Sequence, residues 1–325
     1  MASRIYCTYF DHNYLPRGLA LYHSLQRHAP GAELWVLCLS DACHRALLGL
    51  ALPHLVPVRL VDFEAANPDV AATRSSRSQI EYYFTCSPAW ILFVLENKGD
   101  AEWVTYLDSD LFFFASPDPI YEEMRDAAFG VIPHRFSRGL EEYRRFGLYN
   151  VGWVSVRRRD DGIAALRWWR QRCIEWCYDR VEGDRFADQR YLDQMPETFG
   201  AHVISHLGAN LAPWNISDCR LEWNNGRVEI DQRYPLLFFH FYGVKRSGGY
   251  YFNSHRLYRA PFSGLMKKKL YGPYTAALAE AERSSASLLR GEQFVTMRKL
   301  NVVRRIWMMT YRGVDIVTGR AIAVR

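Results

Sequence analysis

The 325-residue sequence lacks several features that would place it in other classes of protein. No uninterrupted apolar stretch is long enough to span a bilayer, and we find no internal repeat or low-complexity segment. No signal peptide is expected, because residues 1–4 lead directly into a strand-like run. The seven cysteines are scattered and contain no Cys-x-x-Cys pair, which argues against a zinc site or a disulfide framework. We therefore expect reduced, partly buried thiols in a cytoplasmic protein.

The composition favours a soluble enzyme with one large core. Hydrophobic residues make up 49% of the chain and aromatic residues 15%, with 10 Trp and 20 Tyr. This is enough apolar surface for one core, or for one core and an appended segment. A disordered or fibrous protein would not carry this composition.

The positive charge is concentrated at one end of the chain. Residues 290–325 contain eight basic and two acidic residues, a net charge of +6 that equals the net charge of the whole chain. This pattern suggests contact with an anionic surface and argues against a nucleic-acid groove across the fold. Residues 294–309 mix cationic and apolar side chains, as a segment at a membrane interface would. A terminal helix packed on the core with its arginines in water is an equally good interpretation.

The order of strand-like and helix-like segments predicts an α/β fold. Strands at 4–10, 34–39 and 56–61 alternate with helices at 14–28 and 42–50, which predicts a parallel sheet covered on both faces. Further strands are expected at 103–107, 111–114, 128–132, 149–156, 202–205, 227–230 and 236–242, and further helices at 79–97 (interrupted by Pro88), 162–180 and 276–290. We expect a catalytic-type domain over 1–260 and a basic helical extension over 261–325.

The tripeptide Asp108-Ser109-Asp110 lies between two apolar, strand-like runs. Two carboxylates in such a position need a partner, because an unpaired buried charge is very costly. A hard divalent cation, Mg²⁺ or Mn²⁺, is the simplest partner for carboxylate oxygens. A simple polar turn is the alternative. A haloacid-type phosphatase is disfavoured, because it would need this motif near the N-terminus and a later acidic loop.

His240 lies in the apolar run 236–242 and is followed by Gly243, Lys245 and Arg246. A histidine in an apolar strand is more often a core residue than a ligand. The glycine, however, permits close approach of the backbone, and the two cations could hold phosphate oxygens. We therefore treat His240 as a candidate third metal ligand.

Three further segments carry polar residues that could contact a ligand. Asp188 and Gln189 begin a short helix-like segment, in which Asp188 could simply cap the helix. Asn150 precedes a strand glycine, and Trp214-Asn215 follows a proline.

Taken in order, these segments resemble the retaining GT-A glycosyltransferases of glycosyltransferase family 8, which includes glycogenin and bacterial lipopolysaccharide galactosyl- and glucosyltransferases. The resemblance covers residues 4–246 and rests on six motifs in the same order. It implies a metal-dependent transfer of a sugar from a nucleotide diphosphate donor, a UDP-sugar, to the hydroxyl of a glycan or lipid-linked acceptor. Surface glycan or lipopolysaccharide synthesis on the inner face of the cell membrane would suit this activity. No nucleic-acid partner is implied.

The resemblance also implies a role for each matched residue. Asp108, Asp110 and His240 would bind Mn²⁺ or Mg²⁺, and Asp188 and Gln189 would lie at the transferred sugar as the catalytic pair. The remaining matches would hold the donor: Thr8, Tyr9, Asp11, Tyr14, Asn150, Trp214, Asn215, Gly243, Lys245 and Arg246.

Two departures affect the diphosphate contacts. Cys86 replaces the lysine that is usual in the family, and one residue is missing between Gly243 and Lys245. Whether Lys245 or Arg246 meets the diphosphate is therefore open. A sugar-nucleotide nucleotidyltransferase and a non-catalytic nucleotide-sugar or carbohydrate-binding protein remain as alternatives. The first would normally have a Gly-rich, Arg-containing loop where this chain has residues 11–14.

Overall fold

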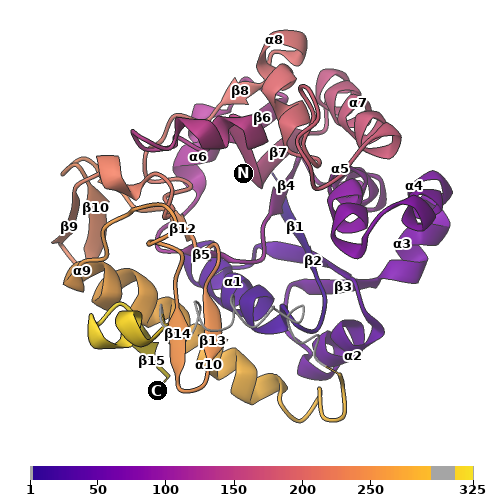
Figure 1. Cartoon of the computed structure of the whole chain (residues 1–325). Coiled ribbons are helices and arrows are strands. Elements are labelled where there is room, and N and C mark those ends of the chain that lie inside the picture. Colours follow the sequence, from indigo (N-terminus) through magenta and orange to yellow (C-terminus); the bar gives the residue numbers. More distant parts are fainter. Residues whose placement is uncertain (1–2, 294–311, 325) are drawn as a thin grey trace.

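A seven-stranded sheet runs through the centre of the computed structural model, which describes residues 3–293 and 312–324 (Figure 1). The strand order is β3-β2-β1-β4-β7-β6-β8. Strands β1 to β4 are parallel, whereas β7 is antiparallel to both of its neighbours, β4 and β6. The seven strands are β1 (Arg4–Phe10), β2 (Glu33–Cys38), β3 (Leu55–Arg59), β4 (Trp103–Leu107), β6 (Phe129–Pro133), β7 (Tyr149–Arg157) and β8 (His202–Val203).

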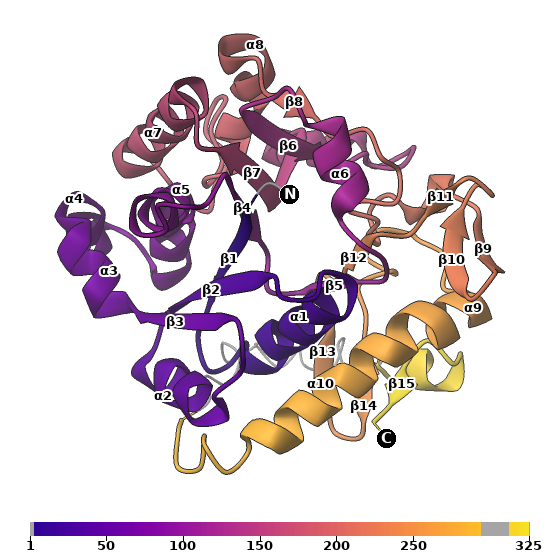
Figure 2. The same ribbon diagram turned by 180° about the vertical axis from the view of Figure 1, so that it is seen from behind.

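Helices cover both faces of this sheet (Figures 1 and 2). On one face α5 and α7 bury Trp90 and Trp169 in the core, and on the other α1 and α2 bury Leu19 and Leu47. The prediction of a mostly parallel sheet flanked by helices is thus confirmed. The helices are α1 (Leu15–His28), α2 (Asp41–Leu50), α3 (Leu60–Ala66), α4 (Pro68–Ala72), α5 (Gln79–Asn97), α6 (Asp118–Glu123), α7 (Asp160–Glu175), α8 (Met195–Phe199), α9 (Gly264–Met266) and α10 (Gly272–Ser285).

Three small antiparallel sheets lie beside the central sheet. One sheet pairs the strand after the turn Asp108-Ser109-Asp110, called the Asp turn below, with the strand that carries His240. This pairing forms part of the candidate site. The sheets are β5 (Leu111–Phe113) with β12 (Phe238–His240); β9 (Leu221–Asn224) with β10 (Arg227–Ile230) and β11 (Tyr234–Pro235); and β13 (Lys245–Ser247) with β14 (Tyr250–Phe252) and β15 (Ile322–Ala323).

The described part of the C-terminal extension packs against the rest of the chain. Helix α10 lies along α1, as Figure 2 shows from behind. Strand β15 pairs with β14, and Lys267 Nζ donates hydrogen bonds to the carbonyls of Gly319 and Ala321. The extension therefore supplies a strand as well as helices. Its division from residues 1–260 as a separate domain stays a prediction.

Three expected helices differ from the structure. The helix expected at 276–290 is α10, which begins and ends earlier, at Gly272 and Ser285. Helix α5 runs through Pro88 without interruption. The proline removes one helical hydrogen bond, but its neighbours Cys86, Ala89 and Trp90 are buried in the core, and this packing holds the helix together. Helix α7 ends at Glu175 rather than at 180, and the chain continues from Trp176 in an extended conformation. Helices α3, α4 and α6 and strand β9 have no counterpart in the sequence prediction.

All seven cysteines are free thiols; six are buried and Cys219 is half-buried, as expected. In residues 3–293 and 312–324, no helix combines the length and the apolar character that crossing a membrane would require.

Candidate active site

The Asp turn sits where the sheet ends. Asp108 follows β4, and Asp110 precedes β5. The turn closes with a hydrogen bond from the Leu111 amide to the Asp108 carbonyl, and the Phe241 amide donates to the Asp110 carbonyl. Because β5 pairs with β12 so that His240 faces Leu111, the backbone brings the histidine to the two carboxylates.

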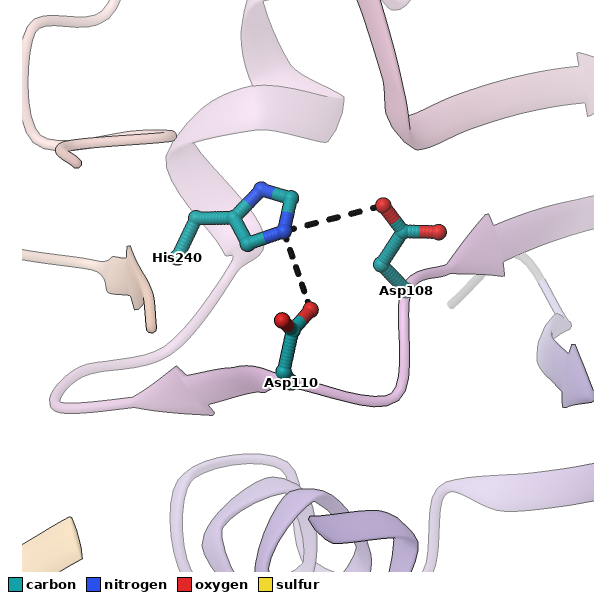
Figure 3. A group of neighbouring side chains, drawn as sticks. All are labelled: Asp108, Asp110 and His240. Carbon is teal, nitrogen blue, oxygen red and sulfur yellow. Dashed lines mark ion pairs between the residues drawn. The ribbon is translucent and has the colours of Figure 1, made fainter. Parts of the chain in front are cut away.

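The three side chains converge on one point (Figure 3). Nε2 of His240 lies 2.9 Å from Oδ1 of Asp110 and 3.7 Å from Oδ2 of Asp108. One ligand atom from each residue can be chosen so that all three lie within 4.8 Å of one another. The structure therefore brings together the three residues that the sequence predicted as metal ligands.

The two acids and the histidine of this cluster shift each other's pKa values. Burial alone would raise the pKa of Asp110 and lower that of His240. Their mutual attraction outweighs burial in both, so the pKa of Asp110 lies below its usual value and that of His240 above it. For Asp108, burial dominates and raises the pKa to about 6, against the opposing charge of His240. Since 31% of the Asp108 side chain is exposed, solvent moderates this effect.

The donor set suits a divalent cation. Two carboxylate oxygens are hard ligands of the kind that Mg²⁺ and Mn²⁺ prefer, and neutral imidazole is a common metal ligand in proteins. Nδ1 of His240 is buried and has no hydrogen-bond partner among the described residues, so the ring is not committed elsewhere through a second bond. The residues thus fit the metal that the sequence predicted.

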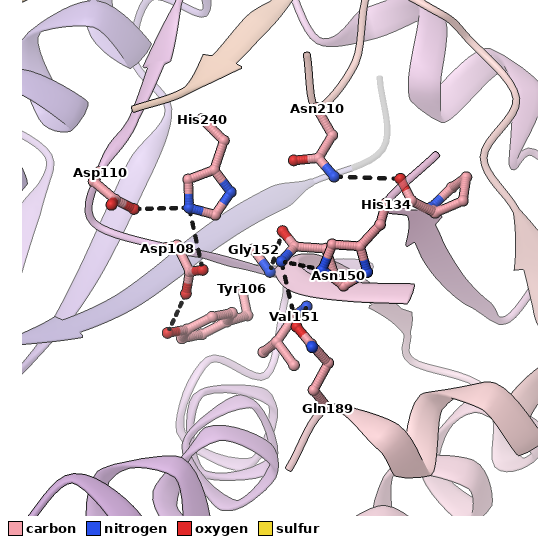
Figure 4. A network of polar contacts seen from close by, with 11 residues as sticks. Tyr106, Asp108, Asp110, His134, Asn150, Val151, Gly152, Gln189, Asn210 and His240 are labelled. Atoms are coloured by element: carbon pink, nitrogen blue, oxygen red, sulfur yellow. Dashed lines mark hydrogen bonds and ion pairs between the residues drawn. The ribbon is translucent and has the colours of Figure 1, made fainter. Parts of the chain in front are cut away.

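A network of amides lies beside this cluster (Figure 4). Gln189 donates from Nε2 to the Phe146 carbonyl at 2.8 Å, which leaves its Oε1 to accept from Asn150 Nδ2 at 3.3 Å. Asn150 Nδ2 also lies 3.2 Å from Nε2 of His134, and Asn150 Oδ1 accepts from the Gly152 amide at 3.1 Å. These bonds fix the orientation of the Asn150 and Gln189 amides, both of which were predicted as site residues.

Asp188 is a buried acid next to this network. The residue is 3% exposed, and Oδ2 has no hydrogen-bond partner among the described residues. Burial raises the pKa of Asp188 to about 7; the hydroxyl of Ser87 lowers it and the charge of Asp108 raises it further. Its backbone carbonyl accepts a hydrogen bond from the Trp169 indole. Asp188 is therefore held by its backbone while its Oδ2 remains available.

These groups line one cavity of about 820 Å³, within the size range of small-molecule sites. Ten of the fifteen predicted site residues contribute to its wall: Tyr9, Asp11, Tyr14, Asp108, Asp110, Asn150, Asp188, Gln189, Trp214 and His240.

Comparison with known proteins identifies two relatives in Bacillus subtilis (strain 168). YfnD is 33% identical over 278 residues, which cover 84% of this chain and 88% of YfnD. YfnF is 33% identical over 250 residues, which cover 74% of this chain and 81% of YfnF. The chain belongs to the same family as YfnD and YfnF. Both relatives are named as uncharacterised proteins, so the kinship assigns no activity. No protein-family model matches the chain.

Several solved structures are similar in their backbone. The apo form of mouse xyloside xylosyltransferase 1 has a TM-score of 0.48 and 13% identity, covering 75% of this chain and 98% of that one. Galactosyltransferase LgtC, solved with donor and acceptor sugar analogues, has a TM-score of 0.47 and 16% identity, covering 91% and 98%. Apo WbbM, a bifunctional glycosyltransferase, has a TM-score of 0.49 and 13% identity, covering 87% and 52%. All three scores are below 0.5, so the functional proposal rests on the residues of this chain.

In this member of the YfnD family, the N-terminal residues divide between cavity and core. Asp11 accepts hydrogen bonds from the amides of Asn13 and Tyr14 at 3.0 and 3.2 Å and thereby shapes the turn into α1. Tyr14 and Tyr9 lie on the cavity wall, and the Tyr9 hydroxyl is 3.1 Å from that of Ser87. Thr8 is fully buried and does not line the cavity.

Four other predicted residues also lie off the cavity wall. Asn215 is buried and fully engaged: Nδ2 donates to the carbonyls of His134 and Asn210, and Oδ1 accepts from the Ala212 amide. Gly243 has a φ of +76° and turns the chain into β13. Lys245 and Arg246 follow in that strand with exposed side chains, and Arg246 pairs with Glu282. Contact of either cation with a diphosphate stays a prediction.

Arg17 supplies a positive charge near the site, and no role was predicted for this residue from the sequence. Its guanidinium lies 4.4 Å from the centre of the Tyr14 ring, and Nη2 donates to the Val244 carbonyl at 2.7 Å. Burial raises the pKa of Asp110, and His240 lowers it; the charge of Arg17 adds a smaller lowering effect. The sequence places Arg17 near the start of α1, close to the predicted donor residue Tyr14. Its contact with Val244, however, depends on the tertiary fold.

Proposed function

We propose that this protein is a metal-dependent GT-A glycosyltransferase that moves a sugar from a nucleotide diphosphate donor, a UDP-sugar, to an acceptor hydroxyl with retention of configuration. The observation that carries the proposal is the convergence of Asp108, Asp110 and His240 on the wall of a cavity that also contains Asp188 and Gln189. The resemblance of the sequence to glycosyltransferase family 8 supports the same activity.

The main chemical task is to stabilise the negative charge that develops on the departing nucleoside diphosphate. A Mn²⁺ or Mg²⁺ ion held by Asp108, Asp110 and His240 would supply this stabilisation as a Lewis acid. Arg17 is close enough to Asp110 to lower the pKa of that carboxyl, and it adds a permanent positive charge. We propose that it supports the diphosphate, in addition to Lys245 or Arg246.

The sugar side is the part of the cavity near Asp188. Its carboxyl would accept hydrogen bonds from sugar hydroxyls, and Gln189 would lie close to the anomeric carbon. Retention through a same-face reaction needs no strong general base, because the leaving phosphate oxygen can take the acceptor proton. The aromatic ring of Tyr14, which lines the cavity, would contact the base of the nucleotide.

A screen of nucleotide sugars with and without Mn²⁺ tests this function. We expect a UDP-sugar to raise the melting temperature only when Mn²⁺ is present, because a ligand that binds the native state stabilises it. We also expect slow release of UDP without acceptor. Release of pyrophosphate from UTP and a sugar 1-phosphate would instead identify a nucleotidyltransferase. Binding without any UDP release, with or without glycan acceptors, would identify a non-catalytic binding protein.

We further propose that the basic segment within 290–325 binds the anionic inner surface of the cell membrane. This contact would bring the enzyme to a lipid-linked acceptor. Arg298, Lys299, Arg304 and Arg305 lie outside the described residues, whereas β15 beyond them pairs with β14. Truncation would therefore remove a strand of the fold. Replacing these four residues with glutamine leaves β15 in place and should abolish co-sedimentation with phosphatidylglycerol vesicles. Unchanged co-sedimentation would exclude this contact.

A further inference from the structure

A continuous series of aromatic rings leads away from His240 along the cavity. The Trp214 ring lies 5.0 Å from the imidazole of His240, Tyr258 lies 5.9 Å from Trp214, and Tyr143 lies 5.4 Å from Tyr258, measured between ring centres. All of these residues line the cavity. We call the set the aromatic belt; its members are Phe136, Tyr143, Phe146, Trp214, Tyr242 and Tyr258.

The belt touches both parts of the proposed donor site. At one end Trp214 packs edge-on against His240 of the metal cluster. At the other end Phe136 stacks on His134, with ring centres 4.6 Å apart, and His134 contacts Asn150 of the amide network. A molecule lying on the belt would therefore be next to both the diphosphate and the transferred sugar.

The belt is assembled from segments that are far apart in the sequence. Phe136, Tyr143 and Phe146 come from the Arg-rich loop between β6 and β7, which contains a short 3₁₀ helix at Glu141–Phe146. Trp214 precedes another 3₁₀ turn, and its indole donates to the His134 carbonyl at 3.0 Å. Tyr242 and Tyr258 flank the sheet β13–β14. This convergence explains why sequence analysis gave no indication of the belt.

The tyrosines of the belt combine flat apolar faces with unused polar groups. Within the described part of the chain, the hydroxyls of Tyr143, Tyr242 and Tyr258 make no hydrogen bond, although other buried tyrosines such as Tyr22 and Tyr191 do. Tyr242 is 46% exposed, and Tyr258 keeps 8% exposure in the cavity wall. A phenol that is held against an apolar wall usually finds a partner, so these hydroxyls are available to a ligand.

This combination matches a pyranose ring. One face of a hexopyranose presents C–H groups, which pack on an aromatic face, while its hydroxyls need hydrogen-bond partners at the rim. A polyprenyl chain would need apolar contact only and would leave the phenols unpaired. Aliphatic side chains such as Leu257 also line the cavity, so the choice of a sugar over a lipid tail rests on the unpaired phenols.

We propose that the aromatic belt is the acceptor subsite and binds a pyranose ring of a glycan acceptor. The proposal rests on the glycosyltransferase function proposed above. In the transfer, the acceptor oxygen forms a bond to the anomeric carbon. The bond from that carbon to the diphosphate oxygen breaks and leaves its electron pair on the diphosphate, which takes the acceptor proton.

Saturation-transfer NMR on the full chain tests the subsite directly. The probes are the methyl α- and β-pyranosides of glucose, galactose and N-acetylglucosamine, offered with saturating UDP and diamagnetic Mg²⁺. We expect at least one pyranoside to bind. Tyr258→Ala and Tyr143→Ala should each weaken its binding about tenfold, a loss typical of a stacked aromatic contact in a site. Tyr258→Phe keeps the ring and should cost less, about two- to threefold, through the lost hydroxyl.

Trp223→Ala is the matched control, because Trp223 is an exposed aromatic residue on β9 that does not line the cavity. UDP binding should stay within about twofold in all four variants, which also shows that they are folded. Absence of binding by every pyranoside, or equal binding by wild type and both alanine variants, would overturn the subsite. Binding of farnesyl phosphate in place of any pyranoside would overturn it in favour of a lipid. Failure of the wild type to bind UDP with Mg²⁺ or Mn²⁺ would instead refute the proposed function itself.

Discussion

Nε2 of His240 lies 2.9 Å from Oδ1 of Asp110, and the pairing of β5 with β12 holds the two residues together. The contact is thus set by the backbone as well as by the side chains. The neighbouring Phe239 and Phe241 are fully buried on either side, which anchors β12 in the core. A binding site supported in this way is organised before its ligand arrives.

The first prediction concerns the metal ligands. Asp110→Asn removes one anionic ligand while keeping the shape of the side chain. We expect the affinity for Mn²⁺ to fall by at least about a hundredfold, because loss of a supporting partner alone commonly costs about 10–100-fold. Titration calorimetry with Mn²⁺ measures this. Asp126→Asn is the control, since its side chain is 94% exposed and remote from the cluster. Wild-type affinity in Asp110→Asn would rule out the proposed metal site.

A second prediction uses the close packing around Gly152. A Cβ atom at this position would lie 2.4 Å from Oδ1 of Asn150 and 3.0 Å from Cε1 of His240. Both side chains are restrained by their own contacts, so Gly152→Ala should displace them and weaken binding of UDP with Mn²⁺ about tenfold. Gly99→Ala meets no atom within 4 Å and should bind normally. Unchanged UDP binding in Gly152→Ala would show that Asn150 and His240 do not position the donor.

The sequence was sufficient to predict the central sheet, because its strands are continuous apolar runs and its first helices carry clear helical spacing. It also predicted the metal cluster, since carboxylates between two buried strands need a partner. The β9–β10 hairpin was missed although it carries a strong local signal. Its turn is Asn225-Gly226, with φ of 47° and 80°, and Asn-Gly is favoured in tight hairpins.

Other parts of the site could not be read from local sequence. The residues after His240 indicated a cation for the diphosphate but not where the chain would carry it: Gly243 turns the chain, and both Lys245 and Arg246 have exposed side chains in β13. The role of Arg17 depends on α1 lying next to Val244, a tertiary contact. The sequence pattern identifies polar residues at the ends of strands and helices. Contacts between segments that are distant in the sequence can be identified only once the tertiary fold is known.

The third prediction separates Arg17 from the other cations. Arg17→Ala should weaken binding of UDP with Mn²⁺ by about tenfold or more, because a hydrogen bond to a charged group contributes about 1.5–3 kcal/mol. Uridine has no phosphate and should bind Arg17→Ala and wild type equally. Arg17→Lys should recover part of the loss. Arg27→Ala, an exposed change at the far end of the same helix, is the control. An equal loss of uridine affinity would show that Arg17 acts on the fold of the site and not on the diphosphate.

The last prediction concerns Asp188, whose buried carboxyl has a pKa of about 7. Its unfolded value is about 3.9, so the folded state binds the proton more tightly. Stability should therefore fall as the pH rises from about 4 to about 7 and then stay at the lower level. Asp188→Asn removes the buried charge and should stabilise the metal-free protein by about 2 kcal/mol at pH 8 and by less at pH 5.

Urea unfolding in EDTA at the two pH values measures this gain, and UDP release from the donor measures the cost. We expect the stabilised variant to be inactive, because the same carboxyl that is unfavourable in the empty cavity is proposed to hold the sugar. Asp184→Asn, an exposed carboxylate in the same loop, should change neither property. A destabilised Asp188→Asn at pH 8 would mean that the charged carboxylate has a stabilising partner in the native protein. Asp188 would then be a structural residue, not an acid kept available for the substrate.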